Sequence, residues 1–175
     1  LAPPSDPETE SAAERLSATA VLIPVAGVLY VPATLQLTLS FAPRELLMCL
    51  AAAAASDTAA YYVGRTFGRR KLWPAVSPGK TWAGSAGGLA ACVLLCLGFG
   101  LSSQTAPPSS AWPMWLGLGL ALGIGAQLGD LFESALKRAS GIKDSGGILP
   151  GHGGLLDRVD SVLPVIAVYA ALRSG

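Results

Sequence analysis

The sequence predicts an all-α fold, a polytopic transmembrane helical bundle with about five membrane helices, from three observations. First, 51% of the 175 residues are hydrophobic and only 13% are charged, which departs from soluble proteins toward membrane proteins. Second, the apolar residues form long runs that approach the roughly 20 residues needed to cross a hydrocarbon core. Third, the charges gather in a few short segments between those runs. The formal net charge of +1 carries little information, and we expect no nucleic-acid partner.

The chain divides into a polar N-terminal segment at residues 1–15 and a transmembrane domain at residues 16–175. The first segment is acidic and contains prolines, as solvated loops often do. The first apolar run, from Leu16 to Leu39, is long enough to span a bilayer. Pro24 and Pro32 can kink this helix, which membrane helices tolerate when neighbours satisfy the freed carbonyl groups.

Four further helices follow the first. Pro43 opens the second, because proline is favoured at helix starts, and we expect this helix to end near Thr58. The third runs from about Ala83 to Leu101, and the fourth from about Trp112 to Arg138 with its spanning part ending at Asp130. The fifth covers residues 155–172. Five glycines between residues 117 and 129 give the fourth helix a small-residue face, which predicts tight helix packing.

An uncharged loop at residues 102–110 indicates how the charged segments meet. If the third and fourth helices form a hairpin around this loop, the charged segments that flank the hairpin emerge on the same side of the membrane. Basic residues mark the cytoplasmic side by the positive-inside rule, and this rule alone explains Arg70 and Lys71. The sequence therefore predicts that Asp57 to Thr81 and Ser134 to Asp160 form two walls of one shared site.

The densest cluster of charge lies between Asp130 and Asp160. This stretch holds nine charged residues and the only histidine of the chain, His152. Asp130 and Glu133 are three residues apart, as are Asp157 and Asp160, so each pair can share one face of a helix. Ionisable groups at a membrane boundary are usually paired, hydrated or bound to a ligand. We therefore interpret the stretch as a functional site, with mutual ion pairing of its acids and bases as the alternative.

Three blocks of residues at fixed spacing stand in these charged segments. The main block consists of Ser134, Lys137, Arg138, Lys143, Asp144, Pro150, His152, Gly153, Gly154, Asp157, Arg158 and Asp160. The second block consists of Ser77, Pro78, Lys80, Thr81, Gly84, Gly87 and Gly88, and the third of Ser56, Asp57, Tyr61, Gly64, Arg65 and Gly68. Together these blocks resemble the signature of the phosphatidate cytidylyltransferase family. The chain departs from the family at Ala83, where the family usually carries Glu.

The resemblance implies an integral membrane enzyme that converts CTP and phosphatidic acid to CDP-diacylglycerol and pyrophosphate. It also implies a homodimer in the bacterial inner membrane, with the active site facing the cytoplasm. Family members usually carry several further membrane helices before this point, so we expect the C-terminal part of a larger fold. Two other enzymes remain open, a CTP-dependent kinase of a polyprenol or other lipid and a cytidylyltransferase acting on an ether-lipid phosphate. A membrane transporter is the non-enzyme alternative.

The residues divide into roles that suit this chemistry. Mg²⁺, with or without a second cation, would take carboxylate ligands together with waters and substrate phosphates. Asp130 and Asp157 are the first candidates for metal ligands, followed by Asp160 and Asp57. Because CTP and phosphatidic acid are both polyanions, cations must offset their repulsion, and seven basic residues can do so. These are Arg65, Arg69, Lys80, Lys137, Arg138, Lys143 and Arg158.

The expected catalytic residues are Asp130, Lys137, Arg138, Lys143, Asp144, His152, Asp157, Arg158 and Asp160. The expected substrate-binding residues are Asp57, Arg65, Ser77, Pro78, Lys80, Thr81, Ser134, Gly153 and Gly154. A phosphomonoester is largely dianionic near neutral pH, with a second pKa of about 6. It therefore needs little help from a base, and we expect His152 to contact phosphate or to position its loop rather than to remove a proton.

Overall fold

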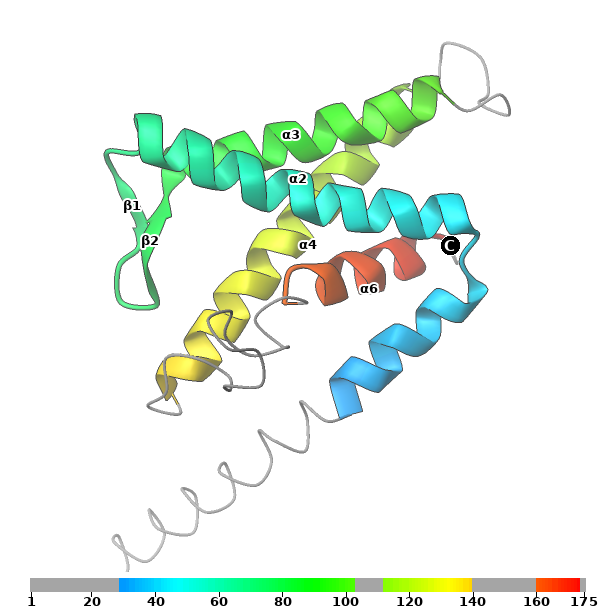
Figure 1. The fold of residues 1–175 in the computed structure, drawn as a ribbon, viewed down its shortest axis with the longest axis horizontal. Coiled ribbons are helices and arrows are strands. Elements are labelled where there is room, and N and C mark those ends of the chain that lie inside the picture. The colour runs from blue at the N-terminus through cyan, green and yellow to red at the C-terminus, as the bar shows by residue number, and fades with distance from the viewer. Residues whose placement is uncertain (1–28, 103–111, 140–159, 174–175) are drawn as a thin grey trace, which may run out of the picture.

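The computed structural model describes residues 29–102, 112–139 and 160–173, which form a helical bundle with one small hairpin. Residues 29–37 are helical and lead through the 3-10 helix η1 (Thr38–Ser40) into α2 (Pro43–Phe67). The strands β1 (Lys71–Trp73) and β2 (Ser77–Thr81) follow, and α3 (Trp82–Leu101) starts directly after them. α4 (Trp112–Ala139) and α6 (Val162–Arg173) complete the described chain. Figure 1 shows α2 and α3 side by side, with α4 crossing them and the hairpin at the far end of α2.

Three of these helices are long and apolar enough to cross a membrane, namely α2, α3 and α4 with 25, 20 and 28 residues. At a rise of about 1.5 Å per residue, each of them reaches the thickness of a hydrocarbon core of roughly 30 Å. α6 has only 12 described residues, and the first predicted helix is described only from residue 29 onward. The helical class of the fold is confirmed, and three of the five expected spans are present in the described ranges.

The second helix is longer than the sequence predicted. It continues through Tyr61, Gly64 and Arg65 to Phe67 instead of ending near Thr58. Two alanines, two tyrosines and a valine after Thr58 continue the helix, and the single Gly64 does not break it, because helix packing offsets the weak helix propensity of glycine. The consequence is that Asp57 lies well inside α2, with nearly three further helical turns of potential site residues beyond it.

The sequence alone does not predict the hairpin of β1 and β2. The strands are antiparallel, with Lys71 opposite Thr81 and Trp73 opposite Ser77. The backbone N–H of Trp82 donates to the carbonyl oxygen of Arg70 at 3.1 Å and closes the hairpin against the start of α3. The hairpin thus fixes the direction in which the chain turns from α2 into α3.

The core lies where α2, α3, α4 and α6 face one another. Its buried side chains are small or aliphatic, including Cys49, Cys92, Leu122 and Ile166. The glycines of α4 serve this packing: a Cβ added at Gly119, Gly123, Gly125 or Gly129 would meet atoms of α3, of α6 or of the residues just before α6 within 3.1 Å. The predicted tight packing of this helix is therefore confirmed, and it occurs within the chain. The homodimer stays a prediction.

Candidate active site

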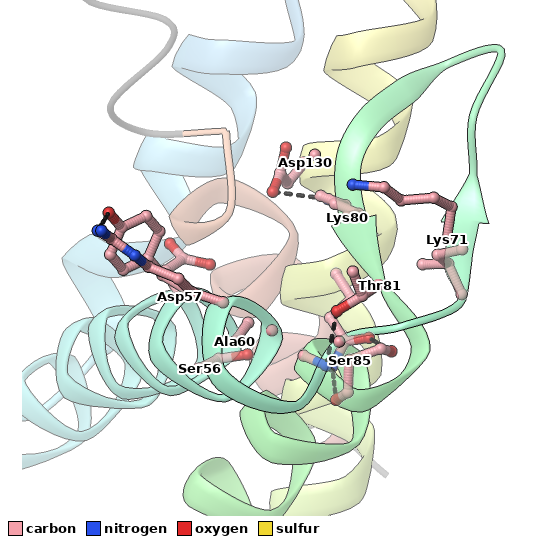
Figure 2. Close-up of a pocket in the computed structure, with 16 residues that line it drawn as sticks. Ser56, Asp57, Ala60, Lys71, Lys80, Thr81, Ser85 and Asp130 are labelled. Atoms are coloured by element: carbon pink, nitrogen blue, oxygen red, sulfur yellow. Dashed lines mark hydrogen bonds and ion pairs between the residues drawn. The ribbon is translucent and has the colours of Figure 1, made fainter.

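A cavity of about 540 Å³ opens at the hairpin end of the bundle, where α2, α3, α4 and the two strands meet (Figure 2). This volume lies within the range of small-molecule sites. Residues from all five elements line it: Ser56, Asp57, Ala60, Tyr61, Gly64, Arg65, Gly68, Lys71, Leu72, Gly79, Lys80, Thr81, Gly84, Ser85, Gln127 and Asp130. The cavity therefore joins residues that are more than 70 positions apart in the sequence.

One face of α2 supplies a wall of the cavity. Asp57, Tyr61 and Gly64 recur at spacings of three or four residues, so they lie along the same side of the helix, and Gly68, which caps its C-terminus, lines the cavity as well. Arg65 adds a guanidinium group that donates to the hydroxyl oxygen of Tyr61 at 3.1 Å. The extension of α2 beyond Thr58 is what aligns these residues, because a loop after Asp57 would not hold them in register.

The close approach of α2 to α3 depends on glycine. A Cβ added at Gly84 would lie 2.6 Å from the carbonyl oxygen of Ala60 and 3.1 Å from Cα of Gly64. Such contacts with backbone cannot relax by a side-chain rotation. Thr81 caps the N-terminus of α3, and its hydroxyl oxygen accepts the N–H of Gly84 at 3.1 Å. This cap fixes β2 at the start of α3 and so places the neighbouring Lys80.

Lys80 reaches from β2 to α4 and forms an ion pair with Asp130. The distance between Nζ of Lys80 and Oδ2 of Asp130 is 2.6 Å, and the two side chains are 24% and 34% exposed. Figure 2 shows this contact among the residues that line the cavity, with Lys71 close by on the neighbouring strand. Ser134, one turn further along α4, donates to the other oxygen of Asp130 over a long 3.5 Å. The pair links the first predicted wall, Asp57 to Thr81, to α4 just before the second predicted wall begins at Ser134. Residues 140–159 of that second wall lie outside the described residues, so the meeting of the two walls stays a prediction.

Two further carboxyl groups lie near this pair. The hydroxyl of Ser161 donates to Oδ2 of Asp57 at 2.7 Å, which ties α2 to the residues just before α6. The N–H of Ser161 donates to Oδ1 of Asp160, also at 2.7 Å. Asp57 is close enough to Asp130, Asp160 and Lys80 for their charges to act on it. Several negative charges and one positive charge therefore share a small region at the edge of the cavity.

This region has the donor chemistry of a site for a hard divalent cation, although not a complete set of ligands. Within the ranges that the structure describes, no three His, Cys, Asp or Glu side chains come close enough to form a metal site by themselves. Asp157, one of the two first candidates for ligands, lies outside those ranges. Because Mg²⁺ needs only one or two protein carboxylates when waters and phosphates complete its shell, Asp130 with Asp57 or Asp160 suits it.

The structure places the predicted site residues in three groups. Asp57, Arg65, Lys80, Thr81 and Asp130 line the cavity. A second group is described but is not among its lining residues: Arg69, Ser77, Pro78, Ser134, Lys137, Arg138 and Asp160. Lys137 instead forms an ion pair with Glu133 at 3.3 Å. The third group lies outside the described residues: Lys143, Asp144, His152, Gly153, Gly154, Asp157 and Arg158.

Sequence reasoning missed three polar residues of the cavity. Lys71, which the positive-inside rule had explained, lines the cavity as well. Gln127 lies one helical turn before Asp130, so the helical spacing could have indicated it. Ser85 follows Gly84 on α3 and bonds to Gln127, and no feature of the sequence pointed to that contact.

Ala83 lies beside the site but is not among the lining residues. It occupies the second position of α3, where a carboxylate would interact favourably with the helix N-terminus, by about 0.3–1 kcal/mol. We therefore expect Ala83→Glu to keep the activity of the protein and to raise its thermal unfolding temperature slightly. Complete loss of activity in this variant, with the fold intact, would show that the small side chain is required.

Comparison with known proteins places the chain in a family. A profile of the cytidylyltransferase family matches residues 8–174. The chain is 50% identical over 122 residues to the phosphatidate cytidylyltransferase of Bacillus subtilis, an alignment that covers 68% of this chain and 44% of that protein. It is 42% identical over 151 residues to the phosphatidate cytidylyltransferase of Brucella suis, covering 83% of this chain and 54% of that protein.

A third relative gives the same result. The phosphatidate cytidylyltransferase of Pseudomonas aeruginosa is 49% identical over 118 residues, covering 67% of this chain and 42% of the relative. The chain thus spans about half the length of the curated relatives it matches. The resemblance that the three sequence blocks indicated is confirmed, and the chain belongs to the cytidylyltransferase family.

Proposed function

We propose that this chain carries the catalytic part of an integral membrane phosphatidate cytidylyltransferase. The reaction joins CTP to phosphatidic acid and yields CDP-diacylglycerol and pyrophosphate. The observation that carries the proposal is the ion pair of Lys80 and Asp130 in the lining of a cavity of about 540 Å³. A cavity that gathers both cations and carboxylates suits a substrate that is itself a polyanion accompanied by a metal ion.

The basic residues account for the binding of phosphate. Arg65, Lys71 and Lys80 line the cavity from α2, β1 and β2, so positive charge reaches it from two sides. Arg can contact two phosphate oxygens at once, whereas Lys acts as a point charge. These charges offset the repulsion between the triphosphate and the phosphate of the lipid, and their fixed positions favour the approach of the two reactants.

In the reaction, an oxygen of the phosphate of phosphatidic acid attacks the α-phosphorus of CTP. The new P–O bond joins the lipid phosphate to CMP, and the bond between the α-phosphorus and the bridging oxygen breaks. The electron pair of that bond leaves with pyrophosphate. The attacking oxygen is already ionised near neutral pH, so the residues of the cavity need to supply positioning and charge stabilisation rather than a strong base.

We further propose Mg²⁺ as the cofactor. Asp130, with Asp57 or Asp160 and the undescribed Asp157, would hold it. When bound, it would offset the negative charge that develops on the α-phosphate and on the departing pyrophosphate. Lys80 would then have two anionic partners within reach, the carboxylate of Asp130 and a phosphate oxygen of the nucleotide. When the nucleotide binds, Lys80 could therefore shift its contact from the carboxylate of Asp130 to the phosphate and leave that carboxylate available to the metal ion.

The location of the site supports a membrane assignment. Arg65, Arg69, Arg70 and Lys71 gather at the end of α2 that carries the cavity, which is the pattern of a cytoplasmic boundary. We propose that the protein lies in the bacterial inner membrane with the cavity open to the cytoplasm, where CTP is found. The lipid would enter sideways between helices, and a homodimer remains part of the proposal.

Product analysis tests the function. Purified protein in lipid vesicles is supplied with CTP, Mg²⁺ and phosphatidic acid, and the lipid is analysed by mass spectrometry while pyrophosphate is measured in solution. We expect equal amounts of pyrophosphate and of a lipid that carries CMP. Release of CDP in place of pyrophosphate would favour the CTP-dependent lipid kinase, and an absence of lipid-dependent turnover would rule out both enzymes. Vesicles with phosphatidylcholine alone are the control.

A further inference from the structure

Ser161 joins the residues just before α6 to the carboxyl groups beside the cavity. It is 3% exposed, and its hydroxyl donates to Oδ2 of Asp57 at 2.7 Å across 104 positions of the chain. Its backbone N–H donates to Oδ1 of Asp160, also at 2.7 Å. One buried residue thus holds an oxygen of each of two carboxyl groups, one on α2 and one just before α6. The phosphate chemistry proposed above does not use this residue.

A glycine of α4 allows this junction to approach Asp130. A Cβ added at Gly129 would lie 2.5 Å from the backbone carbonyl oxygen of Asp160, a contact that no side-chain rotation can relieve. The next residue of α4 is Asp130, which lines the cavity together with Asp57 (Figure 2). Three carboxyl groups from three segments are therefore gathered at one place, and Ser161 bonds to two of them.

Each of the two bonded carboxyl groups keeps one oxygen for another partner. Ser161 occupies Oδ2 of Asp57 and Oδ1 of Asp160, and no hydrogen bond or ion pair within the described ranges reaches the second oxygen of either group. The charges of Asp130 and Asp160 also act on Asp57, so negative charge accumulates at this place. Like charges repel one another unless a cation offsets them. This arrangement therefore favours the binding of a cation.

We propose that Ser161 is a positioning residue of the cation site, which orients the carboxylates of Asp57 and Asp160 so that their second oxygens are available to a hard divalent cation. The inference rests on the proposed function, in which these carboxylates and Asp130 hold Mg²⁺. Carboxylates that bind a metal ion are commonly oriented by a hydrogen bond to their other oxygen. A serine hydroxyl is uncharged, so it orients a carboxylate without neutralising the charge that attracts the cation.

A second hydroxyl links the same two helices away from the cavity. Tyr169 of α6 donates to Oε1 of Glu45 on α2 at 2.9 Å. Twelve residues separate Glu45 from Asp57, which is about 18 Å along the axis of α2. Both bonds run from a hydroxyl of α6 or its start to a carboxylate of α2, but only the bond of Ser161 lies among the gathered carboxyl groups. Tyr169 therefore offers a matched control for a role in holding the helices together.

The experiment measures cation binding without nucleotide or lipid, so it does not depend on turnover. Mn²⁺ is the probe, because it shares the preference of Mg²⁺ for carboxylate and water ligands and its electron paramagnetic resonance signal reports the unbound ion. Detergent-solubilised protein is titrated with Mn²⁺. We expect Ser161→Ala to raise the dissociation constant of Mn²⁺ by about 10–100-fold, the usual loss when the support of a metal ligand is removed. Ser161→Thr, which keeps the hydroxyl, should restore most of the affinity.

Three further variants separate positioning from folding. Tyr169→Phe should lower the unfolding temperature, as Ser161→Ala does, and leave the dissociation constant of Mn²⁺ unchanged. Asp57→Ala should weaken Mn²⁺ binding, and adding Ser161→Ala to it should weaken binding little further, because the hydroxyl has then already lost its acceptor. Ser161→Cys places a weak donor at the same position, so it provides the same measurement if the alanine variant does not fold.

The proposal is overturned if Ser161→Ala lowers the unfolding temperature but keeps the Mn²⁺ affinity of the parent protein, which is the result for a bond that only holds helices together. Full additivity of Ser161→Ala and Asp57→Ala, or a parent protein that binds no Mn²⁺, would also contradict it. A protein whose Mn²⁺ binding depends on Ser161 but that makes no CMP-lipid would instead refute the proposed function and leave the role of Ser161 in place.

Discussion

Asp130→Asn is expected to lower the turnover of CTP and phosphatidic acid by about 10²–10³-fold, the usual scale for the loss of one electrostatic group from a preorganised site. The substitution keeps the size of the side chain but removes the charge that pairs with Lys80 and that would hold the metal ion. The fold should persist, because both partners are partly exposed and water can solvate Lys80. The measurement is kcat/KM for CTP at saturating phosphatidic acid, beside the unfolding temperature.

Glu45→Gln is the matched control for this charge. Glu45 also pairs with a base and accepts a hydrogen bond from the hydroxyl of Tyr169, but it lies at the opposite end of α2 from the cavity. Its loss should lower stability and leave the turnover per folded molecule near that of the parent. If Asp130→Asn retains more than about a tenth of the activity, the carboxylate does not have the role that we assign to it.

The second large effect concerns the packing of α2 against α3. Gly84→Ala should destabilise the protein by about 1–3 kcal/mol, the usual cost of overpacking, because the new methyl group would stand 2.6 Å from the carbonyl oxygen of Ala60. Moving α2 away from α3 would also widen the cavity, so CTP binding should weaken together with stability. Thermal unfolding in detergent and CTP dialysis on the same sample measure the two effects.

Gly98→Ala on the same helix is the control, for which we expect no loss of stability. A Cβ at Gly98 would meet nothing within 4 Å, so the substitution adds no clash and removes the conformational freedom of glycine. It should leave stability unchanged or raise it by about 0.5–1 kcal/mol. Equal effects of the two substitutions would show that the α2–α3 approach is not limited by Gly84.

The hydrophobic pattern predicted most of the helices, because the length of each apolar run indicates how many residues a membrane-spanning helix contains. The third and fourth helices start and end within a residue or so of the predicted positions, since uncharged loops, prolines and glycines bound their apolar runs. The end of α2 was predicted nine residues too early, because tyrosine has only an intermediate helix propensity and Gly64 a low one, so the sequence after Thr58 carries no strong helix signal. Whether this stretch is helix or loop depends on its packing against α3, and local composition does not record that packing.

The charged residues of the candidate site could be predicted from the sequence, whereas its neutral polar residues could not. Charged residues next to apolar runs stand out, so Asp57, Lys80 and Asp130 could be selected from the sequence and the structure places all three around one cavity. Ser85 and Gln127 are ordinary helix residues, and only the crossing of α3 and α4 shows that they bond to each other. Contacts across 42 positions depend on the tertiary fold and leave no local signal.

We propose above all that the cavity between α2, the hairpin and α4 is where CMP is transferred from CTP to a lipid phosphate. The most direct test supplies the protein and phosphatidic acid with CTP labelled with ³²P at either the α- or the γ-phosphate, and counts the label in the extracted lipid. We expect the lipid to take up the α-label only, and Asp130→Asn and Lys80→Met to slow this uptake strongly. Uptake of the γ-label, or full uptake of the α-label in both variants, would contradict the claim.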